Sequence, residues 1–499
     1  MTANLYTSEQ VKRLDHIAIN EHGIDGYSLM KKAAMFSFHT LVKQWPACKK
    51  IHVLCGSGNN AGDGYLLASI AINRGFQVNL HYLSLPENLK NDALHAYHES
   101  QQNNVPCKPF SDKSIQALPN DGSTIIIDAL LGTGLNAEVL GRYKLAIQAC
   151  NISKAPILSI DIPSGLSANT GQVYGLAIKA QCTATFIGMK QGMYTGSGRN
   201  YCGNIFFDRL GITPEIYQKV PVNANKLSLQ SCLNFIKPRE FNAHKGNFGH
   251  VLLIGGDHGY GGAILMAAEA AIRMGAGLVS VATQAEYITA MLTRQPEVMC
   301  HSVCSTEQLR PLIRAASVLV IGPGLGQSEW SRQMLQCALL SKKMIILDAD
   351  ALNLLAIHPD WLKHTNVILT PHPGEAARLL KVDNDKIQEN RFVAVESIQK
   401  QYGGSLLLKG SGSLICHDDS SLKLCPYGNP GMATGGMGDV LSGIIGGLIA
   451  QGLNKEQALE LATCIHAKSA DIAAERSGQR GLLATDLIPI ARNLLNRAL

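Results

Sequence analysis

A glycine-rich stretch with one carboxylate is the first segment of this chain that could perform chemistry. Five glycines lie between Gly431 and Gly443, Asp439 stands among them, and an apolar run follows. A glycine turn that enters a helix leaves several backbone N–H groups unpaired, and these attract phosphate together with the helix dipole. An acid at that entrance repels phosphate. We therefore interpret Asp439 as a base that takes a proton from a substrate hydroxyl, with a plain helix N-cap as the structural alternative.

Glycines also interrupt the apolar run behind this turn. A glycine inside a helix costs roughly 1 kcal/mol relative to alanine, yet Gly443 and Gly447 stand four residues apart, on one face of the expected helix. We predict that another element packs very closely against that face.

Polar residues in the first half of the chain follow apolar, strand-like runs. Asn60, Asp128, Asp161 and Ser164 stand at or just past the ends of three such runs. Because the carboxyl ends of parallel strands share one edge of a sheet, these side chains can converge. Singly, each is more often a turn former or cap. Jointly, they indicate a polar site that could hold a monovalent cation and leave one carboxylate for proton transfer.

The second half shows the same arrangement with other residues. Apolar runs end in residues 255–257, 322–326, 348–353, 370–375 and 409–413, which are rich in glycine and polar residues. Lys409 beside glycines and hydroxyls suits nucleotide phosphates, with a plain hairpin end as the alternative. A solvated loop histidine is the plainer interpretation of His372. The sequence Gly-x-x-x-x-Gly-Lys-Ser/Thr is absent, so the phosphate site is not of the P-loop type.

Alternating strands and helices must position these residues. We expect helices at about 28–45 and 262–274, and strands at 51–55, 77–83, 124–128, 156–160, 184–187, 204–207, 250–254, 278–282, 317–321, 344–347, 367–369 and 405–408. Strand, glycine turn and helix in succession indicate α/β domains with parallel sheets. A proline-dotted stretch at 213–225 separates the two halves.

Composition excludes several classes of protein. A net charge of +6 is small for 499 residues, so we expect no nucleic-acid partner. No apolar run reaches the length of a membrane span and the N-terminus does not resemble a signal peptide, so we expect a cytoplasmic protein without membrane contact. Cys300, His301 and Cys304 come nearest to a metal cluster, but no second ligand pair follows and we disfavour zinc. We interpret the cysteines as buried thiols.

Three motifs of the first half identify a family. Gly-Asn-Asn-x-Gly-Asp-Gly, Asp-Ala-Leu-Leu-Gly-Thr-Gly-Leu and Asp-Ile-Pro-Ser-Gly-Leu occur in this order, and they resemble the epimerase domain of the NAD(P)H-hydrate repair enzymes. The resemblance implies a Rossmann-like domain over residues 1–218 that interconverts the R and S 6-hydroxy hydrates of NADH or NADPH. It implies that Asp161 is catalytic and that Asn60, Asp128 and Ser164 bind K⁺. The implied substrate contacts are Asn59, Asn60, Ala61, Gly62, Asp63, Gly132, Thr133, Gly134, Leu135, Asn136, Ala137, Glu138 and Asp161; Ala61 stands where the family commonly has glycine.

Motifs of the second half resemble the ADP-dependent dehydratase of the same enzymes. They include Gly-Pro-Gly-Leu-Gly, Asp-Ala-Asp-Ala-Leu-Asn, Thr-Pro-His-Pro-Gly-Glu and Gly-Gly-Met-Gly-Asp. The resemblance implies a ribokinase-like domain over residues 226–499, with ADP as co-substrate and Mg²⁺ on its diphosphate. It implies that the hydrate contacts Ala263, Gly326, His372 and Asp439, and that the nucleotide contacts Lys409, Gly410, Ser411, Gly412, Ser413 and Gly438.

On this interpretation the chain repairs hydrated NADH and NADPH in two steps. The first domain supplies the S hydrate from the R form. Asp439 then deprotonates the 6-hydroxyl of the S hydrate, which attacks the β-phosphorus of ADP, and loss of phosphate gives NAD(P)H and AMP. We expect a homo-oligomer. A ribokinase-like small-molecule kinase fused to a nucleotide-sensing domain remains the alternative.

Overall fold

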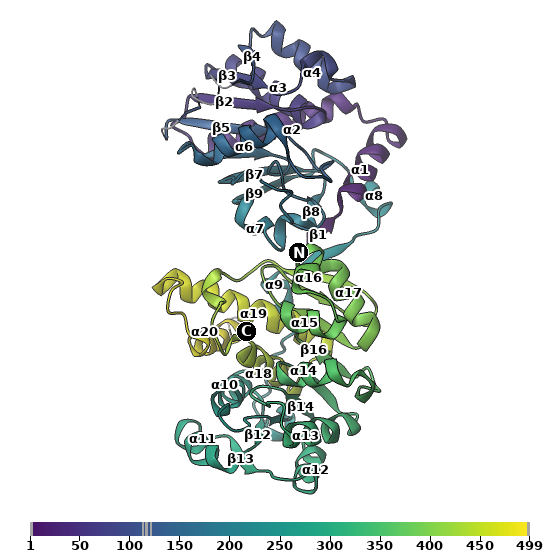
Figure 1. Cartoon of the computed structure of the whole chain (residues 1–499), viewed down its shortest axis with the longest axis vertical. Helices are drawn as coiled ribbons and strands as arrows, with labels where there is room; N and C mark the ends of the chain where they lie inside the picture. The colour runs from purple at the N-terminus through teal and green to yellow at the C-terminus, as the bar shows by residue number, and fades with distance from the viewer. Residues whose placement is uncertain (1–2, 112–113, 115–117, 120–121, 497–499) are drawn as a thin grey trace. The chain divides into compact units, whose positions relative to one another are not determined.

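The computed structural model describes residues 3–111, 114, 118–119 and 122–496. The chain divides into two compact units, Asn4–Ala224 and Asn225–Leu499 (Figure 1). Among the described residues, no helix is long and apolar enough to cross a membrane.

The unit Asn4–Ala224 is built on a parallel sheet with the strand order β4-β3-β2-β5-β6-β7-β9. Its strands are β2 (Lys50–Cys55), β3 (Gln77–Tyr82), β4 (Cys107–Pro109), β5 (Thr124–Ala129), β6 (Ile157–Ile160), β7 (Cys182–Phe186) and β9 (Asn204–Asp208), and the short strands β1 (Ala3–Tyr6) and β8 (Met189–Lys190) pair with each other. The strand order reverses between β2 and β5. This is a doubly wound, Rossmann-like fold, in which ligands bind at the reversal.

Helices cover both faces of this sheet (Figure 1). They are α1 (Ser8–His16), α2 (Gly26–Gln44), α3 (Asn59–Asn73), α4 (Asn91–Gln102), α6 (Gly141–Ile152), α7 (Gly198–Tyr201) and α8 (Pro214–Gln218). Alternate residues of a strand point to opposite faces, so Val53 joins the core under α2 and α3 whereas Leu54 joins the core under α6. A Cβ on Gly64 would lie 2.6 Å from Ala129, so glycine lets α3 lie directly against the sheet.

The unit Asn225–Leu499 contains a larger sheet with the strand order β13-β12-β11-β14-β15-β16-β17-β18-β19. Its strands are β11 (His250–Ile254), β12 (Leu278–Thr283), β13 (Met299–Ser302), β14 (Val318–Ile321), β15 (Met344–Leu347), β16 (Val367–Leu369), β17 (Ser405–Leu408), β18 (Ser413–Cys416) and β19 (Leu422–Cys425), with β10 (Ala224–Lys226) parallel to β19. The sheet is parallel from β13 to β17, and β18 and β19 are antiparallel. Here the order reverses between β11 and β14.

Two helices of this unit, which begin at Gly261 and Met437, carry the predicted contacts Ala263 and Asp439. The helices of the unit are α9 (Leu229–Leu233), α10 (Gly261–Arg273), α11 (Ile288–Arg294), α12 (Thr306–Ala315), α13 (Glu329–Leu340), α14 (Asp350–Ile357), α15 (Pro373–Leu380), α16 (Asn384–Glu389), α17 (Arg391–Tyr402), α18 (Met437–Ala450), α19 (Lys455–Ser477) and α20 (Leu487–Asn496). A Cβ on Gly443 would lie 2.1 Å from the Ala267 carbonyl oxygen, and one on Gly447 would lie 2.7 Å from that of Ala271. The predicted close packing on α18 is therefore confirmed, and the neighbour is α10.

The predicted strands all occur, with small shifts at their ends, and several further strands were not predicted. The predicted strand 184–187 begins earlier, at Cys182, and ends before Ile187, whose φ is +64°. Cys300 and His301 lie in the unpredicted strand β13. Within the described residues no group of three or more His, Cys, Asp or Glu side chains could hold a metal ion, and Cys300 and Cys304 are free thiols.

Candidate active sites in the two units

A cavity of about 580 Å³ lies at the strand reversal of the first unit. The start of α3 and the loops after β5 and β6 line it with these predicted residues: Asn59, Asn60, Asp63, Gly132, Thr133, Gly134, Leu135, Asn136 and Asp161. Asp15 on α1 and Lys190 on β8, which were not predicted, line it as well. The sheet edge therefore gathers most of the residues that the sequence suggested, together with charged residues that it did not.

Four predicted contacts do not line this cavity. Ala61 and Gly62 are buried in α3, where a Cβ on Gly62 would lie 2.7 Å from the sulfur of Met30. Ala137 and Glu138 follow the lining loop, and Glu138 packs on Gly175. Because Ala61 is helical, it does not need the positive φ that a glycine would allow.

Three residues at or beside the cavity present oxygen atoms suited to a monovalent cation. Asn60 lines the cavity, and Ser164, the partner of Asp128, accepts a hydrogen bond from the N–H of the lining residue Leu131 (2.8 Å). The buried Asp128 carboxylate accepts hydrogen bonds from the Ser164 hydroxyl (2.5 Å) and N–H (2.9 Å). Burial raises the pKa of Asp128, and the hydrogen bonds from Ser164 oppose this. The Asn60 side chain is buried without a hydrogen-bond partner among the described residues, and it lies beside Gly132. A buried, unsatisfied amide oxygen is costly unless a cation or water pairs with it.

The proton-transfer candidate Asp161 is held by a buried lysine. Lys190 Nζ forms an ion pair with Asp161 and donates to Thr185 Oγ1 (2.9 Å) and to the Phe186 carbonyl (3.0 Å). Asp161 has φ +65°, an uncommon conformation for a residue other than glycine. The fixed cation and the strained backbone hold the Asp161 carboxylate in one position at the cavity wall.

Three more carboxyl groups line this cavity beside Asp161, namely Asp15, Asp63 and Asp92. Burial, and then the charges of Asp161 and Asp15, raise the pKa of Asp63 well above its usual value. Burial raises the pKa of Asp15 to about 6, although Lys190 opposes this. Neighbouring carboxyl groups with raised pKa values are typical of acid–base sites.

In the second unit, Asp439 lies in the first turn of α18, directly after the glycine loop. The N-cap residue Gly436 has φ +88°, and the Asp439 side chain is half-buried. Burial, and then the charge of Asp348, raise the pKa of Asp439 to about 7; Asp350 adds to this effect and Lys409 opposes it. A Cβ on Gly435 or Gly262 would meet no atom within 4 Å, so open space lies at these glycines of the loop and of α10.

The predicted nucleotide lysine is anchored by carboxylates from two other strand ends. Lys409 Nζ lies 2.7 Å from Asp348 Oδ1 and 3.8 Å from Glu375 Oε2. Burial alone would lower the pKa of Lys409, but Asp348 and Glu375 more than offset it and the pKa is raised. A Cβ on Gly438 would lie 3.1 Å from Lys409 Nζ. Lys409 and Gly438, both predicted nucleotide contacts, are therefore neighbours.

Residues 409–412 form the turn of a hairpin, because β17 and β18 are antiparallel. Arg391, which is almost fully buried, donates to the carbonyls of Leu408 (3.3 Å) and Lys409 (3.2 Å) beneath this turn. Ser413 closes the turn by donating to the Gly410 carbonyl (3.0 Å). The hairpin alternative is thus correct as structure, and it presents Gly410, Ser411 and Gly412 beside Lys409.

The remaining predicted hydrate contacts lie in the first turn of α10 and after the strands β14 and β16. A Cβ on Gly324 would lie 3.2 Å from the Cβ of Ala263, and one on Gly326 would lie 3.0 Å from a carboxylate oxygen of Asp257. The Gly326 N–H donates to Asp350 Oδ2 (3.0 Å). His372 caps α15, and burial, with Lys409 and Arg378 nearby, lowers its pKa to about 4. His372 is therefore a neutral imidazole near pH 7.

Lys190, Asp15 and Arg391 are site residues that sequence reasoning missed. The signal available in the sequence was a charged residue inside a mostly apolar run. Lys190 is such a residue, in the run from 186 to 194, which is mostly buried in the structure. A charge there must be paired.

Each of the two α/β units carries acids, a lysine and glycine turns at the carboxyl edge of a parallel sheet. Together they define a two-domain enzyme with one Rossmann-like and one ribokinase-like domain. The family model described as NAD(P)H-hydrate dehydratase matches residues 251–493, and that described as YjeF-related protein N-terminus matches residues 26–192. A solved structure of a ribokinase-like superfamily protein from Enterococcus faecalis is 31% identical, with a TM-score of 0.51, and covers 55% of this chain and 95% of that one.

Two curated relatives extend over both units. The bifunctional NAD(P)H-hydrate repair enzyme of Coxiella burnetii is 45% identical and covers 99% of each chain. That of Escherichia coli is 39% identical and covers 99% of this chain and 94% of the relative. The chain belongs to the family of bifunctional NAD(P)H-hydrate repair enzymes.

Proposed function

We propose that this chain repairs hydrated NADH and NADPH: the first unit interconverts the R and S hydrates, and the second dehydrates the S form at the expense of ADP. The observation that carries the proposal is Asp439, a half-exposed carboxyl with a pKa near 7 that stands in the first turn of a helix behind a glycine loop. A base whose pKa is near the working pH is suited to proton transfer. The helix entrance supplies the complementary anion site.

In the dehydratase, Asp439 accepts the proton of the 6-hydroxyl while that oxygen attacks the β-phosphorus of ADP. The bond from the β-phosphorus to the bridging oxygen breaks and AMP leaves. Backbone N–H groups at the start of α18 and the Lys409 ammonium stabilise the charge on the transferred group. The C6–O bond then breaks and phosphate leaves, while the ring nitrogen's electron pair forms an N=C6 iminium. Loss of a proton from C5 to the departing phosphate moves these electrons into the C5=C6 double bond and gives NAD(P)H.

In the epimerase, Asp161 is the group that moves a proton to and from the hydrate. Lys190 holds the Asp161 carboxylate in place through a buried ion pair. Asp63, whose pKa is raised, and Asp15, whose pKa is raised to about 6, are the neighbouring groups that can hold a proton. The substrate contacts are the residues of the cavity wall, with Ala61, Gly62, Ala137 and Glu138 as flanking backbone.

Two cations complete the proposal. The fit for K⁺ rests on the unsatisfied Asn60 side chain beside the Asp128–Ser164 pair; K⁺ would satisfy these oxygens and fix the loops that carry them. Mg²⁺ keeps several waters and needs only one or two carboxylates beside substrate phosphates, which suits the acids near Lys409. It would neutralise charge on the diphosphate. A homo-oligomer and a cytoplasmic location stay predictions.

The direct test is to add ADP or ATP to hydrated NADH with the full chain and to follow the recovery of dihydropyridine absorbance. We expect the S hydrate to be recovered with ADP, and the R hydrate to be recovered through the S form. Release of AMP and phosphate in equal amounts supports the phosphoryl route. Failure to recover NADH from either hydrate would overturn the proposal, and a stable phosphoester of another alcohol would favour a small-molecule kinase.

A further inference from the structure

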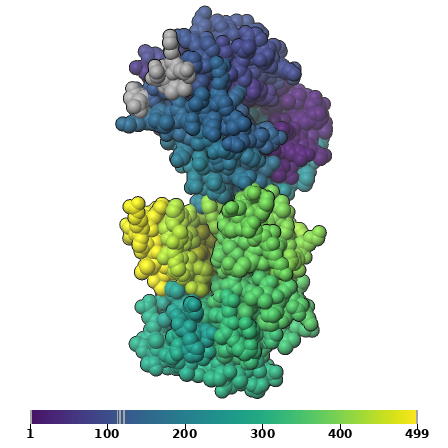
Figure 2. All heavy atoms as spheres, in the orientation of Figure 1, coloured from purple at the N-terminus to yellow at the C-terminus, as the bar shows by residue number. Residues whose placement is uncertain are grey.

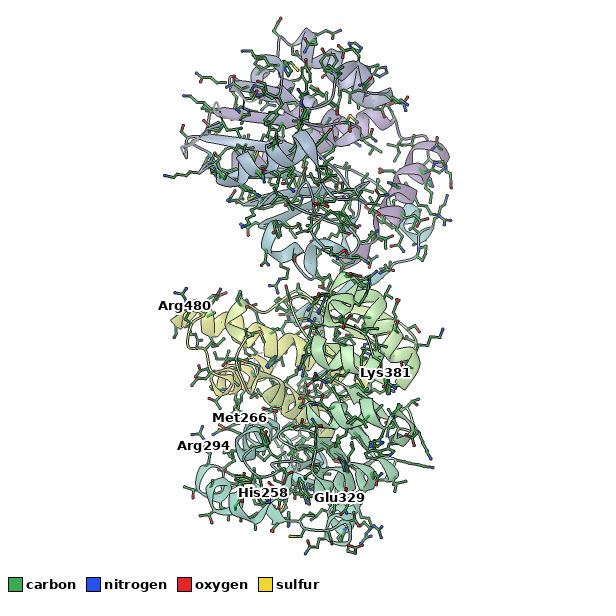
Figure 3. The ribbon with its side chains drawn as sticks, viewed as in Figure 1. His258, Met266, Arg294, Glu329, Lys381 and Arg480 are labelled. Carbon is green, nitrogen blue, oxygen red and sulfur yellow. The ribbon has the colours of Figure 1, made fainter. Side chains whose placement is uncertain are left out.

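A second pocket of the C-terminal unit is lined by arginines rather than by the residues of the proposed chemistry. It has a volume of about 770 Å³ and lies among the ends of α10, α11 and α19 and the side of α20. Five arginines line it: Arg273, Arg294, Arg476, Arg480 and Arg492. Figure 2 shows the yellow surface of the C-terminal helices adjoining the teal surface of α10 and α11, and Figure 3 places Arg480 and Arg294 along the same edge of the unit.

Most of this positive charge is not neutralised within the chain. Glu269 lies 3.5 Å from Arg294, and in the part of the chain that the structure describes the other four arginines form no ion pair. The second lining carboxylate, Asp486, is turned to its own loop, where it accepts a hydrogen bond from the Leu483 N–H (2.9 Å). The pocket thus holds five guanidinium groups and two carboxylates. Glu269 pairs with Arg294, and Asp486 is hydrogen-bonded to the backbone of its own loop.

Helix dipoles explain only part of the cluster. Arg273, Arg294 and Arg476 stand in the last turns of α10, α11 and α19, where a cation is favourable because the carbonyl end of a helix is negative. Arg480 lies in the connection after α19 and Arg492 lies within α20, so neither completes a helix end in this way. Their convergence on one cavity needs another explanation.

We propose that this arginine pocket is a second anion site, which binds the phosphate groups of a nucleotide. Guanidinium groups bind phosphate oxygens in a bidentate manner, and arginines from two sides of the cavity suit two linked phosphates. Buried apolar side chains such as Leu482 and Ile488 form the floor, on which a base or ribose can pack. The volume is in the range of pockets for small ligands, about 300–1,000 Å³.

The pocket is separate from the catalytic entrance but contacts the loop that forms it. The connection after α19 lines the pocket through Arg480, and its Gln479 carbonyl would lie 2.7 Å from a Cβ on Gly431. None of the residues assigned to the hydrate or to ADP lines the pocket. The inference therefore goes beyond the proposed function, and its test measures binding rather than turnover, so either can fail while the other stands.

The first experiment uses the unchanged full chain, inorganic pyrophosphate as probe, and phenylglyoxal as an arginine reagent with mass-spectrometric readout. We expect pyrophosphate to slow the modification of Arg476, Arg480 and Arg492, and to leave the exposed Arg332, outside the pocket, unaffected. Parallel arms with ADP and with NADPH show which nucleotide supplies the phosphates. Equal modification of all four arginines with and without the three probes would overturn the site.

The second experiment compares variants by calorimetric titration with pyrophosphate. Arg476→Gln with Arg480→Gln should remove one class of binding site or weaken it by roughly tenfold or more, since hydrogen bonds to charged groups are lost. The matched control, Arg310→Gln with Arg332→Gln, removes two exposed arginines of α12 and α13 and should titrate like the wild type. Identical isotherms for both variants would contradict the proposal. If the pocket variant does not fold, the modification experiment decides.

Discussion

Lys190 and Lys409 have matching roles in the two units. Each is mostly buried, and each donates to an aspartate at a strand end: Lys190 to Asp161, and Lys409 to Asp348. Removing one partner of such a pair leaves the other charge buried and unpaired, which is strongly unfavourable. Both lysines therefore fix the position of the aspartates with which they pair.

Replacing Lys190 should damage the epimerase selectively. In Lys190→Met a side chain of similar length fills the site, but Asp161 loses its cation and its fixed position. We expect epimerisation to slow on the order of 100-fold, the effect of a small misplacement of a catalytic group. The rate of R-to-S conversion is measured by chromatography, and dehydration of pure S hydrate is the internal control. An epimerase rate equal to that of the wild type would contradict the role of Lys190.

The pH dependence of the dehydratase should report Asp439. Its pKa is raised to about 7, and only the ionised form can accept the hydroxyl proton. At saturating substrates kcat should be flat above pH 7 and should fall about tenfold per pH unit well below it.

Glu375 also has its pKa raised to about 7, by burial and by Asp348, with Lys409 opposing. The variant Glu375→Gln therefore serves as the control, and it should retain the acid limb of the profile. A profile that stays flat down to pH 5, or a limb that disappears in Glu375→Gln, would refute the assignment to Asp439.

At the scale of elements, the start of α18 depends on how closely the helix lies against α10. A Cβ on Gly443 would lie 2.1 Å from the Ala267 carbonyl, whereas one on Gly262, in α10, would meet nothing within 4 Å. Glycine in α18 thus sets the position of the helix entrance that carries Asp439.

A pair of alanine substitutions tests this packing. Gly443→Ala should lower the free energy of unfolding by about 1–3 kcal/mol, the usual cost of overpacking. Gly262→Ala should be neutral or stabilising by up to about 1 kcal/mol, because alanine favours the helix. Urea unfolding of the two variants measures the difference. A Gly443→Ala variant as stable as Gly262→Ala would show that the contact between α10 and α18 is looser than described.

The sequence predicted the elements that have strong local signals and missed those that depend on distant partners. Central strands such as β5 and β14 are apolar runs that end in glycine or aspartate, so both their place and their polar ends could be predicted. The strand β13 lies at the sheet edge, where polar and apolar residues mix, and it was missed.

The site residues that the sequence did not predict were missed for the same reason, because they depend on distant partners. Lys190 pairs with an acid 29 residues earlier, and Arg391 supports a turn 18 residues later. Neither spacing is a local pattern, so only the folded chain brings these groups together. Asp439 could be found because its glycine loop is adjacent in the sequence.

At the scale of the whole molecule, two units with separate cores and separate sheet edges should give separable activities. Only the first unit holds the proposed potassium site, at Asn60, Asp128 and Ser164. Replacing K⁺ by a large organic cation such as tetramethylammonium should slow R-to-S conversion, because the oxygens lose their ion, while dehydration of S hydrate by ADP continues. Chromatography of the two hydrates in both buffers measures this. Equal loss of both activities would argue against a potassium site confined to the first unit.

The most direct test of the central claim is the dehydration rate of Asp439→Asn with S hydrate, ADP and Mg²⁺, compared with the exposed Asp360→Asn as a matched control. The amide keeps the shape of Asp439 but cannot take the proton. We predict that kcat falls by about 10²–10⁴, the range expected for a lost general base, while R-to-S conversion and the Asp360→Asn variant stay at the wild-type level. A kcat for Asp439→Asn within about threefold of wild type, where loss of a base costs far more, would contradict the account.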